Sequence, residues 1–116
     1  MRLKLIVALV NDDKIDVVVD AARAGGATGE TIITSVRGDG LRPDKTFFGL
    51  DLAAKRDVIL FLVVETRARE ILERISEAAR LDTEPGAGIA FQVPIEDAVG
   101  LSTQLPTILE ELETEI

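Results

Sequence analysis

Two short apolar runs, at residues 5–10 and 58–64, constrain the fold of this chain more than any other feature. Each run has about the length of a β-strand and is far shorter than the roughly 20 apolar residues that span a bilayer. Both runs are apolar at even and at odd positions, and successive side chains of a strand point to opposite faces of its sheet. The runs therefore predict central strands that are buried on both faces.

Each run is followed by the same order of signals: a helix, a glycine turn and a further strand. In the first half, apolar residues recur every three or four positions over residues 15–22, which is the spacing of one buried helical stripe. Asn11 is a candidate N-cap for this helix, and the glycine pair at 25–26 ends it. The β-branched stretch 31–36 predicts a second strand.

The second half repeats this order. Thr66 is a candidate N-cap for a helix whose apolar positions run from Ala68 to Ala79. A glycine-rich turn at 85–88 then precedes a predicted strand at 89–93. The duplication predicts an α+β fold, a ferredoxin-like βαββαβ sandwich.

This sandwich occupies residues 1–100, and leucines and isoleucines at helical spacing predict an added acidic amphipathic helix over residues 101–116. The two helices of such a fold cover one face of the sheet, and the C-terminal helix is too short to cover the other face. We therefore expect a homo-oligomer in which sheets pack against one another.

The composition excludes several functions. The chain has no cysteine and no histidine, so it lacks thiolates, zinc–thiolate sites and the usual general base at neutral pH. Thirteen lysines and arginines against 21 acidic residues give a net charge of -8, which disfavours nucleic acid as a partner. The chain has no run long enough for a membrane span and no stretch with the layout of a secretory signal. We expect a cytoplasmic protein without direct membrane insertion.

The connection over residues 37–56 is far longer than the few residues that usually link two strands, and such connections are commonly functional. It is locally cationic in an acidic chain, because it has three aspartates and a larger number of basic residues. The basic residues are Arg37, Arg42, Lys45, Lys55 and Arg56. An anionic ligand or partner fits this charge. Phe47 and Phe48, in its middle, either dock into another protein or fill the core of their own subunit.

The chain resembles the PII-like signal-transduction proteins over residues 3–100. The resemblance is carried by the first strand and by three glycine-containing segments, at residues 4–8, 26–32, 36–40 and 86–91. It implies a homotrimer of ferredoxin-like subunits that binds adenine nucleotides and controls transporters and enzymes through a long flexible loop.

The resemblance also implies a site in the cleft between neighbouring subunits, where backbone N–H groups approach nucleotide phosphates. The glycines at this cleft would be Gly29, Gly38, Gly40, Gly86 and Gly88. Glycine permits close backbone approach, and successive N–H groups form an anion-binding concavity. Arg37 and Arg42 would add positive charge. The alternative is that these glycines only supply positive φ angles at turns.

The chain departs from the family pattern in its charges. Ile89 occupies the position of the family's lysine, Phe61 that of an acidic residue and Leu41 that of an arginine, and residues 101–116 contain no lysine or arginine. The chain has no tyrosine, so modification of a loop tyrosine is excluded. A nucleotide monophosphate, diphosphate or cyclic form needs fewer cations than ATP.

We therefore expect a non-enzymatic regulatory protein that senses a small anionic effector, such as an adenine nucleotide, without a catalytic or metal site. It would control a target, such as a membrane transporter, through residues 37–56. The alternatives are a structural or metal-tolerance-like trimer, an RNA-binding module and an enzyme. The enzyme would use carboxylates that stand at predicted helix starts or near strand ends: Asp12, Asp13, Glu65 or Asp97.

Overall fold

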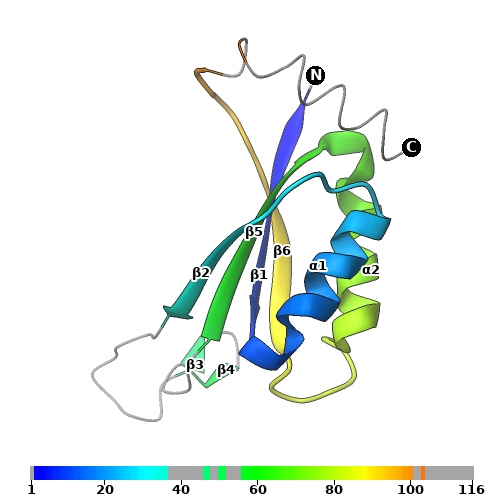
Figure 1. Cartoon of the computed structure of the whole chain (residues 1–116), viewed down its shortest axis with the longest axis vertical. Coiled ribbons are helices and arrows are strands. Elements are labelled where there is room, and N and C mark those ends of the chain that lie inside the picture. Colours follow the sequence, from blue (N-terminus) through cyan, green and yellow to red (C-terminus); the bar gives the residue numbers. More distant parts are fainter. Residues whose placement is uncertain (1, 37–45, 48–49, 52–55, 101–102, 104–116) are drawn as a thin grey trace.

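The computed structural model describes residues 2–36, 46–47, 50–51, 56–100 and 103. Four strands form an antiparallel sheet in the order β2-β5-β1-β6 (Figure 1). Their bounds are Leu3–Val10 for β1, Thr31–Val36 for β2, Arg56–Val64 for β5 and Gly88–Pro94 for β6. The central strands β1 and β5 are the two apolar runs, each two residues longer at its N-terminal end than the sequence predicts.

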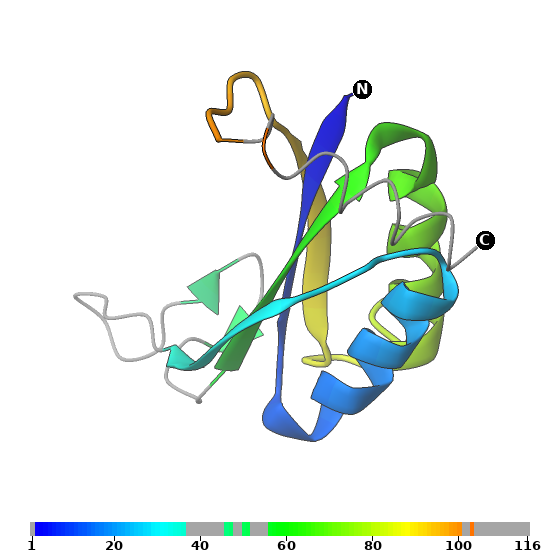
Figure 2. The ribbon, with the colours of Figure 1, turned by 45° about the horizontal axis from the view of Figure 1, so that its top comes forward.

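Two helices link the strands and cover one face of the sheet (Figures 1 and 2). A short 3-10 helix leads into the first of them. The bounds are Asp12–Lys14 for the 3-10 helix η1, Ile15–Ala24 for α1 and Glu65–Ala79 for α2. Because β5 lies between β2 and β1, and β1 lies between β5 and β6, each βαβ unit is split by a strand of the other. The predicted ferredoxin-like βαββαβ fold is confirmed.

The core lies between the helices and one face of the sheet. Even-numbered residues of β1 and odd-numbered residues of β5 point towards the helices, as the pairing of Ile6 with Phe61 shows. The buried stripes of the two helices meet these residues, and α1 packs against α2. The largest fully buried side chains are Phe61, Ile6, Ile59, Ile71, Ile75, Val10 and Val18.

The opposite face of the sheet is apolar and carries no helix among the described residues. Leu5 of β1 lies between Leu62 of β5 and Val93 of β6 on this face, and Phe91 lies beside them. Leu62, Phe91 and Val93 are 37–39% exposed. The apolar strands predict burial on both faces of the sheet. Within the described chain, the helices bury one face, and the other face is left open. The predicted C-terminal helix lies outside the described residues except for Thr103.

Two local predictions need correction, and the long connection has one feature that the sequence did not predict. Helix α2 begins at Glu65 with Val64 at its N-cap, so Thr66 is not the cap. Asn11 precedes η1, but its side chain makes no capping hydrogen bond. The long connection contains a short hairpin formed by β3, Thr46–Phe47, and β4, Leu50–Asp51. Phe48 lies outside the described residues, and the role of Phe47 stays a prediction.

Helix α2 ends at Ala79, and the residue at its C-cap, Arg80, adopts a left-handed conformation with φ of 58°. This conformation strains a residue that carries a Cβ atom and is relaxed for glycine. We expect Arg80→Gly to raise the free energy of unfolding by about 0.5–1 kcal/mol. Arg69→Gly, at an exposed position inside the same helix, should lower it by about 1 kcal/mol. Urea denaturation of both variants measures the contrast, and equal signs would contradict the assignment of strain.

Candidate functional site

One end of the sheet gathers the base of the long connection and the glycine turn that precedes β6. Val36 at the end of β2 pairs with Arg56 at the start of β5. Val10, at the end of β1, lies between Asp57 and Gly88. The β3–β4 hairpin and the turn at residues 80–87 lie at this same end (Figure 1). The topology therefore places the two segments that the sequence singles out next to each other.

Arg56 connects these segments. Its side chain is buried, with the residue 5% exposed, and its Nη1 donates hydrogen bonds to Asn11 Oδ1 at 2.7 Å and to the carbonyl oxygen of Gly86 at 3.0 Å. The sequence counts Arg56 among the cations that an external anion could reach, and the structure corrects this. The amide oxygen of Asn11 binds Arg56 instead of capping the following helix.

A second contact holds the turn from the side of η1. Lys14 Nζ lies 2.6 Å from Glu84 Oε2 and donates a hydrogen bond of 2.9 Å to the carbonyl oxygen of Ala79. The ammonium group thus satisfies a carbonyl at the C-terminus of α2, where positive charge is favourable. The hydrogen bond and the charge of Lys14 lower the pKa of Glu84 below its usual value of 4.5. The turn is therefore tied to the first half of the chain at two places.

The three described candidate glycines differ in what the subunit requires of them. Gly88 has φ of 144°, and a Cβ atom there would lie 2.4 Å from the carbonyl oxygen of Leu9. Gly86 has φ of 77° and open space around it. Gly29 has no positive φ, and no atom lies within 4 Å of the place that a Cβ atom would occupy. The fold of the subunit thus requires glycine at position 88, because of both φ and packing, and favours glycine at position 86 because of its φ angle. It gives no reason for glycine at position 29.

Gly29 lines a small cavity of about 230 Å³ at the other end of β2. The cavity wall is mostly apolar and includes the hydroxyl-bearing residues Thr28 and Thr31. Glu30 also lines the cavity, and its side chain forms an ion pair of 3.1 Å with Arg23. Ligand pockets usually exceed roughly 300 Å³, so this cavity is large enough for part of a ligand.

The candidate residues do not form one site within a single subunit. Gly29 precedes β2 at one edge of the sheet, whereas Gly86 and Gly88 adjoin β6 at the opposite edge. The remaining candidates lie outside the described residues: Arg37, Gly38, Gly40 and Arg42. A site that combines Gly29 with the glycine turn therefore requires a second copy of the chain.

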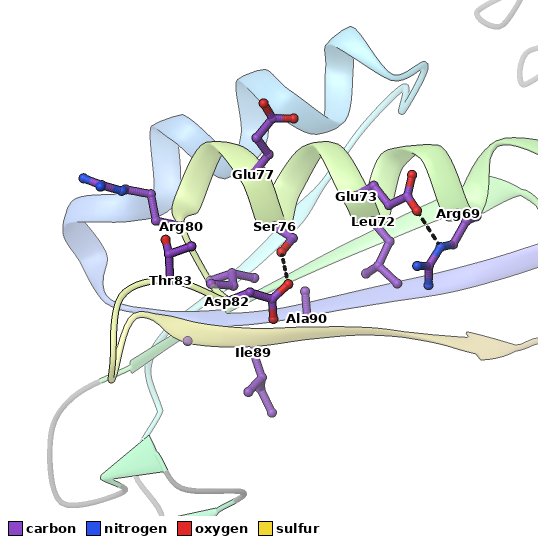
Figure 3. Close-up of a pocket in the computed structure, with 12 residues that line it drawn as sticks. Arg69, Leu72, Glu73, Ser76, Glu77, Arg80, Asp82, Thr83, Ile89 and Ala90 are labelled. Carbon is purple, nitrogen blue, oxygen red and sulfur yellow. Dashed lines mark hydrogen bonds and ion pairs between the residues drawn. The ribbon is translucent and has the colours of Figure 1, made fainter.

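A larger groove of about 720 Å³ lies between α2 and β6 (Figure 3). Leu72 and Ala90 face each other across it, and a hydrogen bond of 3.0 Å joins Ser76 to Asp82. Ile89 points away from α2, towards the open face of the sheet. Both arginines and acidic residues line the groove, so it offers no field of one sign to an anion.

The described residues show no arrangement that favours catalysis by carboxylates. They contain no group of three or more acidic residues that could hold a metal ion. Arg2 lies 4.0 Å from Glu65, one of the carboxylates considered for an enzyme. No described helix is long and apolar enough to cross a membrane.

The comparison with known families decides the identity of the fold. Residues 3–104 match the family model of nitrogen regulatory protein P-II. The chain belongs to this family. P-II proteins are signalling regulators, so the membership supports a regulatory role.

A solved structure agrees with the P-II assignment. The chain matches the crystal structure of a protein from Thermus thermophilus that is assigned to the PII-like signaling proteins, with a TM-score of 0.59 and 24% identity. The match covers 88% of this chain and 95% of the other. At this identity the likeness shows the fold alone. No curated protein matches the chain.

The glycines of this P-II chain should respond differently to the same substitution. Gly88→Ala forces a Cβ atom against the backbone of Leu9 and should lower the free energy of unfolding by about 2–3 kcal/mol or more. Gly29→Ala meets open space and should change it by less than about 0.5 kcal/mol. Denaturant titration of each variant measures the difference, and a large loss in Gly29→Ala would show a structural role for Gly29.

Proposed function

We propose that the chain is a non-enzymatic PII-like regulatory protein. It assembles as a homotrimer in the cytoplasm, binds an adenine nucleotide between subunits and controls a partner protein through residues 37–56. The observation that carries the proposal is that Gly29 lines a mostly apolar cavity although the fold of the subunit does not require a glycine there. Family membership supports the regulatory role.

The open sheet face supports the assembly. Its side chains are apolar on three neighbouring strands, and burial of such a patch is the main driving force for association. Sheets that pack face to face bury side chains like Leu62 and Phe91 in a shared core. The same assembly would give the split site its second copy.

A pair of variants tests this assembly. Leu62 on the open face and Val17 on α1 have nearly equal exposure, 39% and 40%. Leu62→Glu would bury a charge between subunits and should dissociate the trimer, whereas Val17→Glu should leave it intact. Sedimentation equilibrium distinguishes three times the 12.5 kDa chain mass from a single chain. Identical behaviour of both variants would argue against packing through the open face.

The proposed ligand follows from the chemistry of the two part-sites. The cavity beside Gly29 is mostly apolar and suits a flat ring, while the glycine turn suits a phosphate because its backbone can be approached closely. The site has few cations of its own. A nucleoside monophosphate, diphosphate or cyclic nucleotide therefore fits better than ATP, with Arg37 and Arg42 as proposed phosphate ligands.

The proposed mechanism is ligand-dependent docking. A nucleotide at the base of the connection favours one of its conformations, and that conformation presents residues 46–50 to the target. The target is proposed to be a membrane transporter or another regulated protein. Because linkage is reciprocal, binding of the target must change nucleotide affinity by the same factor.

Calorimetric titration with ATP, ADP, AMP and cyclic AMP tests the proposal. We expect saturable binding close to one site per subunit for at least one of the last three. Replacement of both Arg37 and Arg42 by alanine should weaken it at least about tenfold, because each charged hydrogen bond contributes about 1.5–3 kcal/mol. Replacement of Arg69 and Arg74 by alanine, two arginines that pair with acidic residues within α2, removes the same charge outside the proposed site and should leave binding unchanged.

The outcomes separate the proposal from its main alternative. Binding that survives the double replacement would remove both arginines from the site. If the wild-type protein binds none of the four nucleotides, the trimer without a nucleotide site, structural or related to metal tolerance, becomes the better explanation.

A further inference from the structure

Arg56 joins three separate segments at the end of the sheet that carries the glycine turn. As the first residue of β5, it lies opposite Val36, so the two strands that flank the long connection are paired at this point. Its Nη1 also donates to Asn11, after β1, and to Gly86, in the turn. The side chain of Arg56 therefore connects the turn to a residue whose backbone pairs the two ends of the connection.

The environment of this guanidinium is unfavourable for stability alone. Arg56 is 5% exposed, and its Nε is buried without a hydrogen-bond partner. The acceptors of Nη1 are both neutral oxygens, although arginine remains charged at every physiological pH. A buried charged donor left unpaired is destabilising, and an apolar side chain would often replace it at no loss. Such local conflicts are typical of positions that serve a function.

Gly86 is the part of the turn that depends on Arg56. Gly88 is held by its pairing with Val10, and the N–H of Ala87 donates a hydrogen bond of 3.1 Å to the carbonyl oxygen of Glu84. Gly86 has a positive φ, and no atom lies within 4 Å of the place that a Cβ atom would occupy. The peptide group that joins Gly86 to Ala87 is held by two contacts, the bond from its N–H to Glu84 inside the turn and the bond that its carbonyl oxygen accepts from Arg56 outside the turn.

We propose that Arg56 is a positioning residue of the nucleotide site and acts through the backbone of Gly86. Its guanidinium holds the Gly86 carbonyl oxygen inward, which fixes the face that the turn presents to a phosphate. The two N–H groups of Nη1 hold both acceptors at once, at 2.7 and 3.0 Å, and the planar guanidinium fixes the directions of these N–H groups, which a lysine ammonium does not. The inference rests on the proposed function, since it assigns Arg56 a role towards the same ligand.

Hydrogen exchange of the full chain tests the first half of this inference without any nucleotide. Arg56→Gln should raise exchange at residues 84–88 at least about tenfold and leave the protection of α2 around Ile71 unchanged. Arg56→Lys should give an intermediate increase. Arg74→Gln removes an exposed arginine that pairs with Glu70 within α2, and it should behave like the wild type.

Titration of the same proteins with ATP, ADP, AMP and cyclic AMP tests the second half. Where the wild type binds, Arg56→Gln should weaken binding at least about tenfold, and Arg56→Lys should weaken it less. A loosened turn with unchanged affinity would overturn the positioning role and leave the proposed function standing. Full recovery of exchange and affinity in Arg56→Lys would overturn the requirement for the fixed geometry of a guanidinium.

The remaining outcomes are also decisive. Faster exchange throughout α2 as well as the turn would show general destabilisation and overturn the role. If the wild type binds no nucleotide, the proposed function fails, and with it the role towards a ligand, while the exchange data still decide whether Arg56 holds the turn.

Should Arg56→Gln fail to fold, Arg56→Lys and Asn11→Ala carry the test. Asn11→Ala removes one acceptor and should leave exchange at the turn close to that of the wild type.

Discussion

The structure depends on one constraint, the burial of apolar side chains on both faces of β1 and β5. Two helices cover one face and close the core around Phe61 and Ile71. The other face keeps Leu62, Phe91 and Val93 more than one-third exposed. Neither central strand can turn its apolar residues inward on one side only, because neighbouring side chains of a strand point in opposite directions. The pattern that folds the subunit therefore also calls for a cover on the second face, which the proposed homotrimer would supply.

The same constraint shapes the candidate site. Strand order places β2 and β6 at opposite edges of the sheet, so Gly29 and the glycine turn are kept apart in one subunit. Association through the open face would bring edges of different subunits near each other. Under the proposed function, the residues that bind the effector are complete only in the assembly. Subunit association and sensing would then be linked, because a ligand that bridges two copies stabilises the state in which they meet.

The fold could be predicted because periodicity reports burial directly, whereas contacts between distant residues leave no such pattern. Asn11 has the composition and position of a helix cap, yet its oxygen binds Arg56, which is 45 residues away. Arg56 itself belongs to a cationic stretch in the sequence and is buried in the fold. The one feature of the sequence that could have indicated the burial of Arg56 is its position just before an apolar strand. Gly29 and Gly88 look alike in the sequence, and only the φ angle and the nearest atoms separate an open position from a packing requirement.

Under the proposed function, the charges near the two part-sites would favour a ligand with a small negative charge. The chain carries a net charge of -8, which repels anions at long range. Close to the turn, the positive charge of Lys14 is balanced by Glu84, and close to the cavity that of Arg23 is balanced by Glu30. Among the described residues, a phosphate at the turn would therefore be held mainly by backbone N–H groups, and the proposed ligands Arg37 and Arg42 would add the charge. Under the proposed function, each further phosphate would add negative charge that these few cations must balance, so a nucleotide with few phosphates fits the site better than ATP.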